Sequence, residues 1–376
     1  MNRLLLFFLL IISVVCQGQG YLDSLPLLHR GEILIIGEYH NVKEIHDLEL
    51  DVVRHYAEKS QDSVVILLEW PYEKNYYVNR LFSSNDSTLF FDYSDKQYEM
   101  YGPSMYNKLM TLYHINQKTH NLKVFCYDNV ASTQQKIYIV HDMLNTYPSL
   151  PEPILSIRMY LDSSLQAHNS DFRSKVDSFG DVHKFFLSHF NKYRNLYKKT
   201  LLPEDFKLLC HKQPSFSNNY DLRESVLYRN VRSHYDRHCL YIAICGATHA
   251  NKEKILSDKK YKNKRTKPLA WQLNQKIGSP FRQKVHSICV APYITKYPAT
   301  VINDTLTIPP KEMEIPVRQI PSAVKRELSD RSEQIAVKRT NLILEPELRN
   351  QFDAYILIHT AHTTVPGNRE RQDEIW

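Results

Sequence analysis

The chain has 376 residues, of which 43% are hydrophobic and 24% are charged, and this composition excludes a disordered or collagen-like chain. Its length suits one large α/β domain or two smaller ones. The formal net charge of +7 is partly concentrated in residues 252–267, but no nucleic-acid-binding motif accompanies these lysines. We therefore interpret this basic run as a solvated loop and predict no nucleic-acid partner.

Residues 1–18 have the pattern of a signal peptide. One early arginine, Arg3, precedes an apolar run that is too short to make a good membrane span. The sequence therefore predicts an exported protein, periplasmic or secreted, with no transmembrane helix after signal removal. A lipid anchor on Cys16 is the less favoured alternative, because the residues before it fit a lipobox poorly.

The segment after the signal peptide predicts a βαβ unit. Two short apolar runs, Ile33–Ile36 and Val64–Leu68, flank a helical pattern at residues 44–59, and such runs are typical of buried parallel strands. In that helical pattern, apolar residues recur at the spacing of one helix face.

The rest of the chain continues the α/β pattern. We expect a helix at 105–119, a mostly helical insertion or cap at 131–235, and one helix with surface excursions at 291–350. Further strands are expected at residues 122–127, 238–245, 284–290 and 354–358. The predicted fold is a three-layer α/β domain over residues 19–376. It has a central parallel-rich sheet, with the helical insertion over a cleft that the aromatic-rich loop 83–97 could roof.

The cysteines do not suggest a thiolate metal site. No Cys-x-x-Cys occurs, and four of the five cysteines after Cys16 lie in apolar runs, where cysteine usually behaves as a small buried side chain. One disulfide stays open as an alternative in an exported protein.

Ionisable side chains follow several of the predicted strands, at Glu38, His40, Glu69, Asp128 and His249. Ligands of open parallel sheets bind beyond the carboxyl ends of the strands, so we expect these groups to face one cleft. Two kinds of chemistry fit them. A carboxylate can orient a histidine as a general base, or Glu38, His40, Glu69 and His249 can hold a divalent metal that activates water.

Arg223, on a predicted helix before the strand at 238–245, has a charge suited to an oxyanion or a substrate carboxylate. Purely structural roles also stay open for several of these residues. Glu38 could cap a helix, Glu69 could be a helix-start acid, and Asp128 belongs to an ordinary turn dipeptide. His46 is expected on the surface of the first helix.

Three motifs resemble the erythromycin esterase-like superfamily, which also includes ChaN-type haem-binding proteins and the Tiki and TraB proteases. They are Ile-Ile-Gly-Glu-Tyr-His-Asn at 35–41, Val-Val-Ile-Leu-Leu-Glu at 64–69 and Cys-Gly-Ala-Thr-His-Ala at 245–250. Residues 113–128, 223–230 and 352–358 are also similar to segments of these esterases.

The resemblance implies a single α/β domain with a helical insertion. It carries site roles to Glu38, His40, Glu69, Arg223 and His249, with His40 as the base that activates water against an ester or lactone. Candidate substrate-binding residues are Tyr39, Asp128 and Asn230.

We therefore predict an exported hydrolase with a small-molecule substrate. Two alternatives remain open. A haem-binding or uptake protein is suggested by the Glu-Tyr-His spacing and the 25 tyrosines. A metal-dependent protease of the Tiki type is suggested by the paired Gly-x-x-His motifs. The cofactor would accordingly be none, a haem or a divalent metal.

Overall fold

The structure is a computed structural model. It describes residues 22, 25–40, 42–84, 107–128, 133–169, 178–211, 220–256, 265–297 and 352–362, and short strands at 300–302, 306–308, 311–314 and 335–338. The predicted signal peptide at 1–18, including Cys16, and most of the predicted roof loop at 83–97 lie outside these residues.

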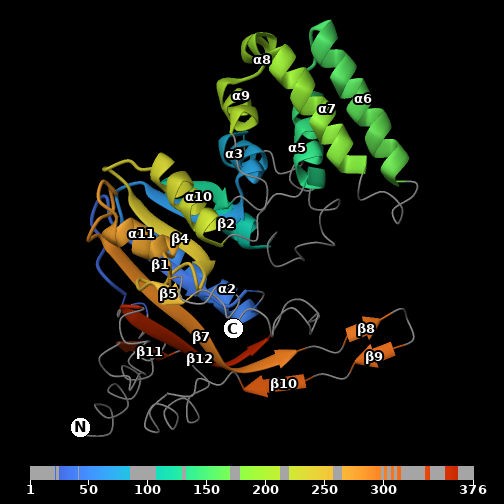
Figure 1. The fold of residues 1–376 in the computed structure, drawn as a ribbon. Helices are drawn as coiled ribbons and strands as arrows, with labels where there is room; N and C mark the ends of the chain where they lie inside the picture. The colour runs from blue at the N-terminus through green and yellow to red at the C-terminus, as the bar shows by residue number, and fades with distance from the viewer. Residues whose placement is uncertain are drawn as a thin grey trace, which may run out of the picture. The chain divides into compact units, whose positions relative to one another are not determined.

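The main sheet confirms the predicted α/β class (Figure 1). Its strands follow the order β11-β12-β7-β1-β4-β2-β3, and β10 pairs with β7 outside this path. β1 runs parallel to β4 and to β7, and β7 runs parallel to β12, whereas β10 and β11 pair antiparallel with β7 and β12. The strands are β1 (Ile33–Glu38), β2 (Val64–Pro71), β3 (Leu122–Asp128), β4 (Leu240–Gly246), β7 (Val285–Tyr297), β10 (Lys311–Glu314), β11 (Ile335–Lys338) and β12 (Ala354–His362).

β1 is buried along its whole length between β4 and β7. All six of its residues are buried, and Ile33–Ile36 are at most 1% exposed. Such an apolar, mostly β-branched run suits a strand covered on both faces. At its end, Gly37 pairs with Cys245 on β4 and with Cys289 on β7. Glu38 is therefore the last residue of a strand that is buried along its whole length.

The chain forms two compact units. The first unit comprises residues 1–67, 91–123 and 231–376, and the second comprises residues 68–90 and 124–230. The first unit holds α2 (Lys43–Lys59), a helix at residues 107–119, and α11 (Leu269–Gln275). It also contains two small antiparallel pairs, β5 (Ile255–Leu256) with β6 (Arg265–Thr266) and β8 (Thr300–Ile302) with β9 (Leu306–Ile308).

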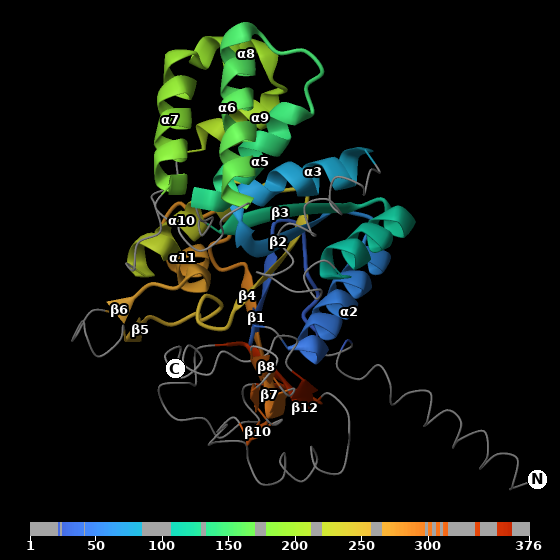
Figure 2. The ribbon, with the colours of Figure 1, turned by 90° about the vertical axis from the view of Figure 1, so that its right-hand side faces the viewer.

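The second unit is mostly helical, as the pattern at 131–235 predicts. In it α5, α6 and α7 lie side by side in both Figure 1 and Figure 2. Phe186, Phe190 and Tyr197 pack against one another in its core. Whether these helices cap a cleft stays a prediction. The helices are η2 (Tyr72–Lys74), α3 (Asn75–Ser84), α5 (Thr133–Asn145), α6 (Glu152–Asn169), α7 (Ser178–Lys192), α8 (Arg194–Thr200), α9 (Pro203–Cys210) and α10 (Tyr220–Ser233), whose last residues fall in the first unit.

The C-terminal third differs from the expectation. Between residues 291 and 350, the described residues are all strand, and the expected helix does not occur among them. β7 runs on to Tyr297 because β12 and β10 pair with its second half, and this pairing is not visible in the local sequence pattern.

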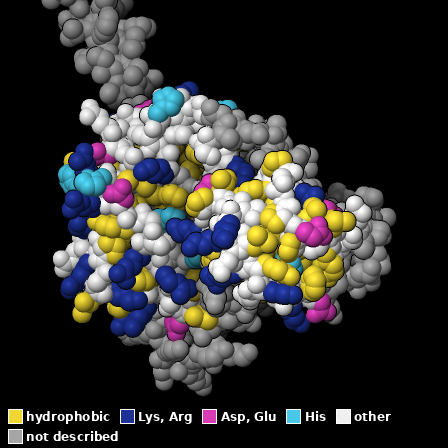
Figure 3. Space-filling model, turned by 90° about the horizontal axis from the view of Figure 1, so that it is seen from above, with side chains coloured by type: hydrophobic (Ala, Val, Ile, Leu, Met, Phe, Trp, Pro, Cys, Tyr) yellow, Lys and Arg dark blue, Asp and Glu magenta, His cyan; other side chains and the backbone are white. Residues whose placement is uncertain are grey.

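The cysteines behave as predicted for buried thiols. Cys126, Cys239, Cys245 and Cys289 are buried, Cys210 is half-buried, and all five are free. None of the described helices combines the length and the hydropathy that a membrane span requires. On the face seen in Figure 3, Lys and Arg side chains are spread widely and Asp and Glu are few, consistent with the positive formal charge.

Candidate functional site

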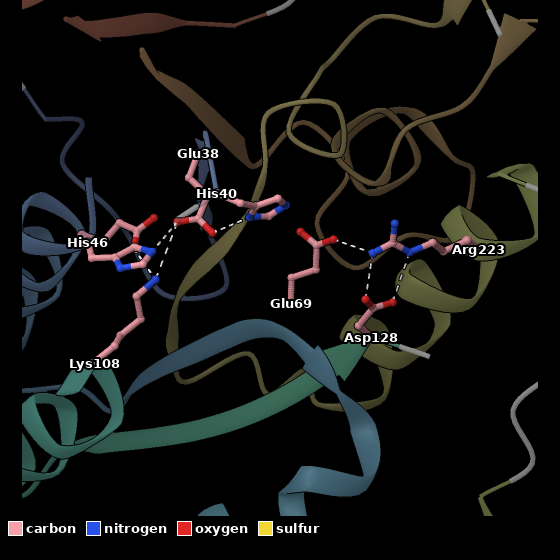
Figure 4. Close-up of polar contacts among 8 residues, drawn as sticks. Glu38, His40, His46, Glu69, Lys108, Asp128 and Arg223 are labelled. Carbon is pink, nitrogen blue, oxygen red and sulfur yellow. Dashed lines mark hydrogen bonds and ion pairs between the residues drawn. The ribbon is translucent and has the colours of Figure 1, made fainter. Parts of the chain in front are cut away.

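Glu38 and His40 form a hydrogen-bonded pair at the carboxyl end of β1. The Nδ1 atom of His40 lies 2.9 Å from Oε1 of Glu38 (Figure 4). The His40 side chain is 51% exposed, whereas that of Glu38 is only 9% exposed. When Nδ1 carries the proton and donates it to Glu38, Nε2 is the basic atom of the ring. The pair thus joins an accessible imidazole to a buried carboxylate.

A buried ion cluster lies on the other side of the Glu38 carboxylate, and we define it as Glu38, His46, Glu49 and Lys108. Lys108 Nζ lies 2.6 Å from Oε2 of Glu49 and 3.6 Å from Oε2 of Glu38. Nε2 of His46 lies 3.8 Å from the same Glu38 oxygen. α2 supplies His46 and Glu49, and the helix at 107–119 supplies Lys108.

Charges in this cluster shift the affinities of its members for protons. Burial raises the pKa of Glu38, but the Lys108 ammonium, together with hydrogen bonds to Glu49 and His40, outweighs burial and holds this pKa well below its usual value. Burial, together with the negative charge of Glu38, raises the pKa of Glu49 well above its usual value. Burial lowers the pKa of Lys108, yet the two carboxylates outweigh it and raise this pKa. These shifts favour the ionised form of Glu38, the charged form of Lys108 and the protonated form of Glu49.

His46 corrects the sequence interpretation, which placed it on the helix surface. It is only 7% exposed. α2 is buried over more of its circumference than its apolar stripe indicated, because Glu49 and His46 also turn inward. Burial, reinforced by the nearby Lys108 charge, lowers the pKa of His46 to about 4. The ring is therefore neutral at pH 7.

We expect the neutral His46 to make the fold sensitive to acid. An unfolded chain protonates this histidine below pH 6.5, whereas the folded chain does not until about pH 4, so folding stability falls as the pH falls through this window. Between pH 7.5 and pH 5 this difference costs about 2 kcal/mol of unfolding free energy. Urea unfolding at both pH values measures the decrease in unfolding free energy, and this decrease should be about 2 kcal/mol smaller in His46→Gln than in the wild type. The control His114→Gln changes an exposed histidine and should show the same decrease as the wild type. A decrease in His46→Gln equal to that of the wild type would refute the assignment.

His249 lies in the turn that follows β4. Gly246, the last residue of β4, pairs with Glu38, and the amide of Ala247 donates to the Glu38 carbonyl oxygen at 3.0 Å. The amide of His249 donates to the Gly246 carbonyl oxygen at 2.9 Å, and His249 is 4% exposed. The turn carrying His249 is thus hydrogen-bonded to the end of β1. Tyr39, between Glu38 and His40, is half-buried.

In the second unit, Glu69, Asp128 and Arg223 form a separate ion cluster. Nη2 of Arg223 donates to Oε1 of Glu69 at 2.6 Å and to Oδ2 of Asp128 at 2.8 Å, and Nε donates to Oδ1 of Asp128 at 3.3 Å (Figure 4). The side chains of Glu69 and Asp128 are 7% and 4% exposed. Two strand ends, on β2 and β3, thus present carboxylates to one guanidinium from α10.

The guanidinium of Arg223 is held charged by its partners. Burial lowers its pKa, and the two carboxylates outweigh burial and raise the pKa above its usual value. Burial, with the Glu224 charge, also raises the pKa of the neighbouring Tyr220. Asn230, a predicted substrate-binding residue, donates from Nδ2 to the Tyr127 carbonyl oxygen at 2.8 Å and so ties α10 to β3.

The structure therefore brings Glu38 together with His40 in one unit and Glu69 together with Asp128 and Arg223 in the other. Sequence reasoning missed Glu49 and Lys108 and misplaced His46. Of these three residues only Glu49 has a signal in the sequence, because it is an acid among the inward-facing apolar positions of α2. Among the described residues, the group suited to a metal is Glu38, His46 and Glu49, whose ligand atoms lie within 4.8 Å of one another. This group shares only Glu38 with the predicted metal-ligand set.

Comparison with known proteins supports the fold. No protein-family model matches the chain, and no curated protein matches its sequence. A solved succinoglycan biosynthesis protein aligns with a TM-score of 0.51 at 12% identity, over 88% of each chain.

Two other solved structures align less closely. A variant of erythromycin esterase EreC in its open conformation has a TM-score of 0.45 at 11% identity, over 92% of this chain and 93% of that one. A Bacillus cereus protein has a TM-score of 0.44 at 12% identity, over 90% and 91%. At these identities the likeness is remote and concerns the fold alone.

Proposed function

We propose that this protein is a hydrolase in which His40 activates water for attack on an ester or lactone. The observation that supports the proposal is the pair of His40 and Glu38, in which a half-exposed imidazole donates to a buried carboxylate over 2.9 Å. A carboxylate in that position fixes the imidazole tautomer and stabilises the imidazolium that forms during proton transfer.

The chemical steps follow from that tautomer. Nε2 of His40 takes a proton from water while the water oxygen attacks the substrate carbonyl carbon, which gives a tetrahedral oxyanion. The imidazolium then returns the proton to the leaving alkoxide oxygen as the carbon–oxygen bond breaks, and the products are a carboxylic acid and an alcohol. Glu38 stays ionised during these steps, because the Lys108 ammonium lies 3.6 Å from its carboxylate.

Other roles remain predictions from the resemblance. They are orientation of His40 by Glu69, oxyanion stabilisation by His249 and Arg223, and substrate contacts from Tyr39, Asp128 and Asn230. Export as a periplasmic or secreted protein also remains a proposal that depends on residues 1–18 alone.

A panel of activated esters and lactones tests the proposal. We expect turnover by the mature protein and a loss of about 10²- to 10⁴-fold in kcat/KM for His40→Ala, the size of effect typical of a general base. His114→Ala removes an exposed histidine from the helix at 107–119 and should keep wild-type activity.

Turnover that survives in His40→Ala would refute the role of His40. Absorbance spectra and incubation with a chelator, recorded on the same samples, address the alternatives. A haem band in the spectrum would favour the haem-binding protein, and activity that disappears on chelation would favour the metal-dependent protease.

A further inference from the structure

The buried ion cluster is arranged around the ammonium group of Lys108. Two carboxylates and an imidazole, ligand types that divalent metals use, converge in the first unit. Nζ of Lys108 lies 2.6 Å from Glu49 and 3.6 Å from Glu38, and Lys108 is only 4% exposed. A cationic group of the chain itself is thus already placed among these ligands.

The contacts of the cluster suit an ammonium group. The 2.6 Å distance between Nζ of Lys108 and Oε2 of Glu49 is that of a charge-assisted hydrogen bond. The ligand atoms of Glu38, His46 and Glu49 lie within 4.8 Å of one another, close enough for a single cation to contact all three.

The cluster also retains the capacity to bind a metal. Nδ1 of His46 is buried and has no hydrogen-bond partner among the described residues. Without Lys108, two carboxyl groups and this imidazole would face one another with no cation, an arrangement that strongly favours uptake of a divalent ion or of protons.

We propose that the Lys108 ammonium is the resident cation of a site whose ligands, Glu38, His46 and Glu49, accept a divalent metal only when that ammonium is removed. The lysine thereby balances the buried charge of Glu38 in place of a metal ion. This inference concerns the occupant of the cluster and holds whether or not His40 acts on an ester.

Zinc titration by calorimetry tests the proposal on four proteins: the wild type, Lys108→Ala, Lys108→Ala with Glu49→Gln, and Lys74→Ala. Lys74 is a matched control, because it is another lysine with only 6% exposure, and its ammonium lies 5.3 Å from the centre of the Trp70 ring. We expect Lys108→Ala to bind one more Zn²⁺ per chain than the wild type. Adding Glu49→Gln should abolish that gain, and Lys74→Ala should match the wild type.

Two results would overturn the proposal. One is a folded Lys108→Ala protein that binds no more zinc than the wild type. The other is zinc binding by the wild type that disappears in Glu49→Gln or His46→Ala, because the ligands would then hold a metal while Lys108 is present. This second comparison does not need Lys108→Ala to fold. If that variant unfolds, zinc should restore its folding cooperatively, and a failure of zinc to do so would also count against the proposal.

Discussion

Arg223→Met should destabilise the second unit by about 3–5 kcal/mol, the usual cost of removing one partner from a buried ion pair. The guanidinium bonds to both Glu69 and Asp128, and these carboxylates are 7% and 4% exposed. Methionine keeps much of the side-chain volume but leaves both carboxylates without their shared cation. Thermal and urea unfolding at pH 7 measure the loss.

Two further variants separate charge from packing. Glu69→Gln in the Arg223→Met background removes one buried charge and should recover part of the lost stability. Arg223→Lys keeps a charge but loses the two-pronged contact with Asp128, so its loss should be smaller than that of Arg223→Met.

The pH dependence gives an independent check. Carboxylates that have lost their cation hold protons more tightly, so the gap between Arg223→Met and the wild type should narrow as the pH falls toward 4.5. A gap that is unchanged from pH 7 to pH 4.5 would mean that the lost stability came from packing alone.

Gly37→Val should prevent the first unit from folding stably. A Cβ atom at Gly37 would lie 2.7 Å from the Cβ of Ala250 and 3.0 Å from the Cα of Ala247. Both contacts are too short, and Gly37 lies in a strand with neighbours on both sides. Overpacking a core usually costs about 1–3 kcal/mol, and we expect valine here to exceed that range because backbone atoms form part of the obstacle. Soluble yield and thermal unfolding measure the effect.

A double-mutant cycle tests the stated cause. Gly37→Ala should reduce the unfolding free energy less than Gly37→Val does. Adding Ala250→Gly to Gly37→Ala should restore part of the lost stability, because it removes the Cβ atom that makes the closest contact. Gly180→Ala is the control. Apart from its chain neighbours and the backbone of α7 itself, none of the described residues has an atom within 4 Å of the added Cβ, so alanine should be neutral or slightly stabilising. If the stability losses of Gly37→Ala and Ala250→Gly simply add in the double variant, crowding against Ala250 is not the cause.

Local sequence patterns predicted most elements of the central sheet correctly. The apolar runs at 33–36 and 64–68 and the amphipathic pattern at 44–59 became β1, β2 and α2 within a few residues. These elements are set by hydrophobic periodicity, which a local stretch carries by itself. The order of the strands in the sheet could not be predicted in this way, because nothing in residues 33–38 specifies β4 and β7 as the neighbours of β1.

The same distinction between local and distant sequence information applies to the candidate site. The pair of Glu38 and His40 could be predicted because both residues follow one strand at close spacing. Lys108 could not, since it comes from another helix and meets Glu38 only through tertiary packing. His46 was misplaced because an amphipathic pattern identifies the most apolar face of a helix and is silent about polar residues buried beside it. Buried charges are held by partners distant in sequence, and local patterns do not record them.

The position of β1 between β4 and β7 has a consequence for biosynthesis. The ribosome makes β1 first, but both of its neighbours are synthesised much later, at residues 240–246 and 285–297. During most of translation this apolar segment has two unsatisfied hydrogen-bonding edges, a state that invites association with other chains. The high contact order of such pairing also makes folding slow. The centre of the first unit therefore cannot assemble before residues 285–297 have been made, and the edges of β1 stay open to other chains until then.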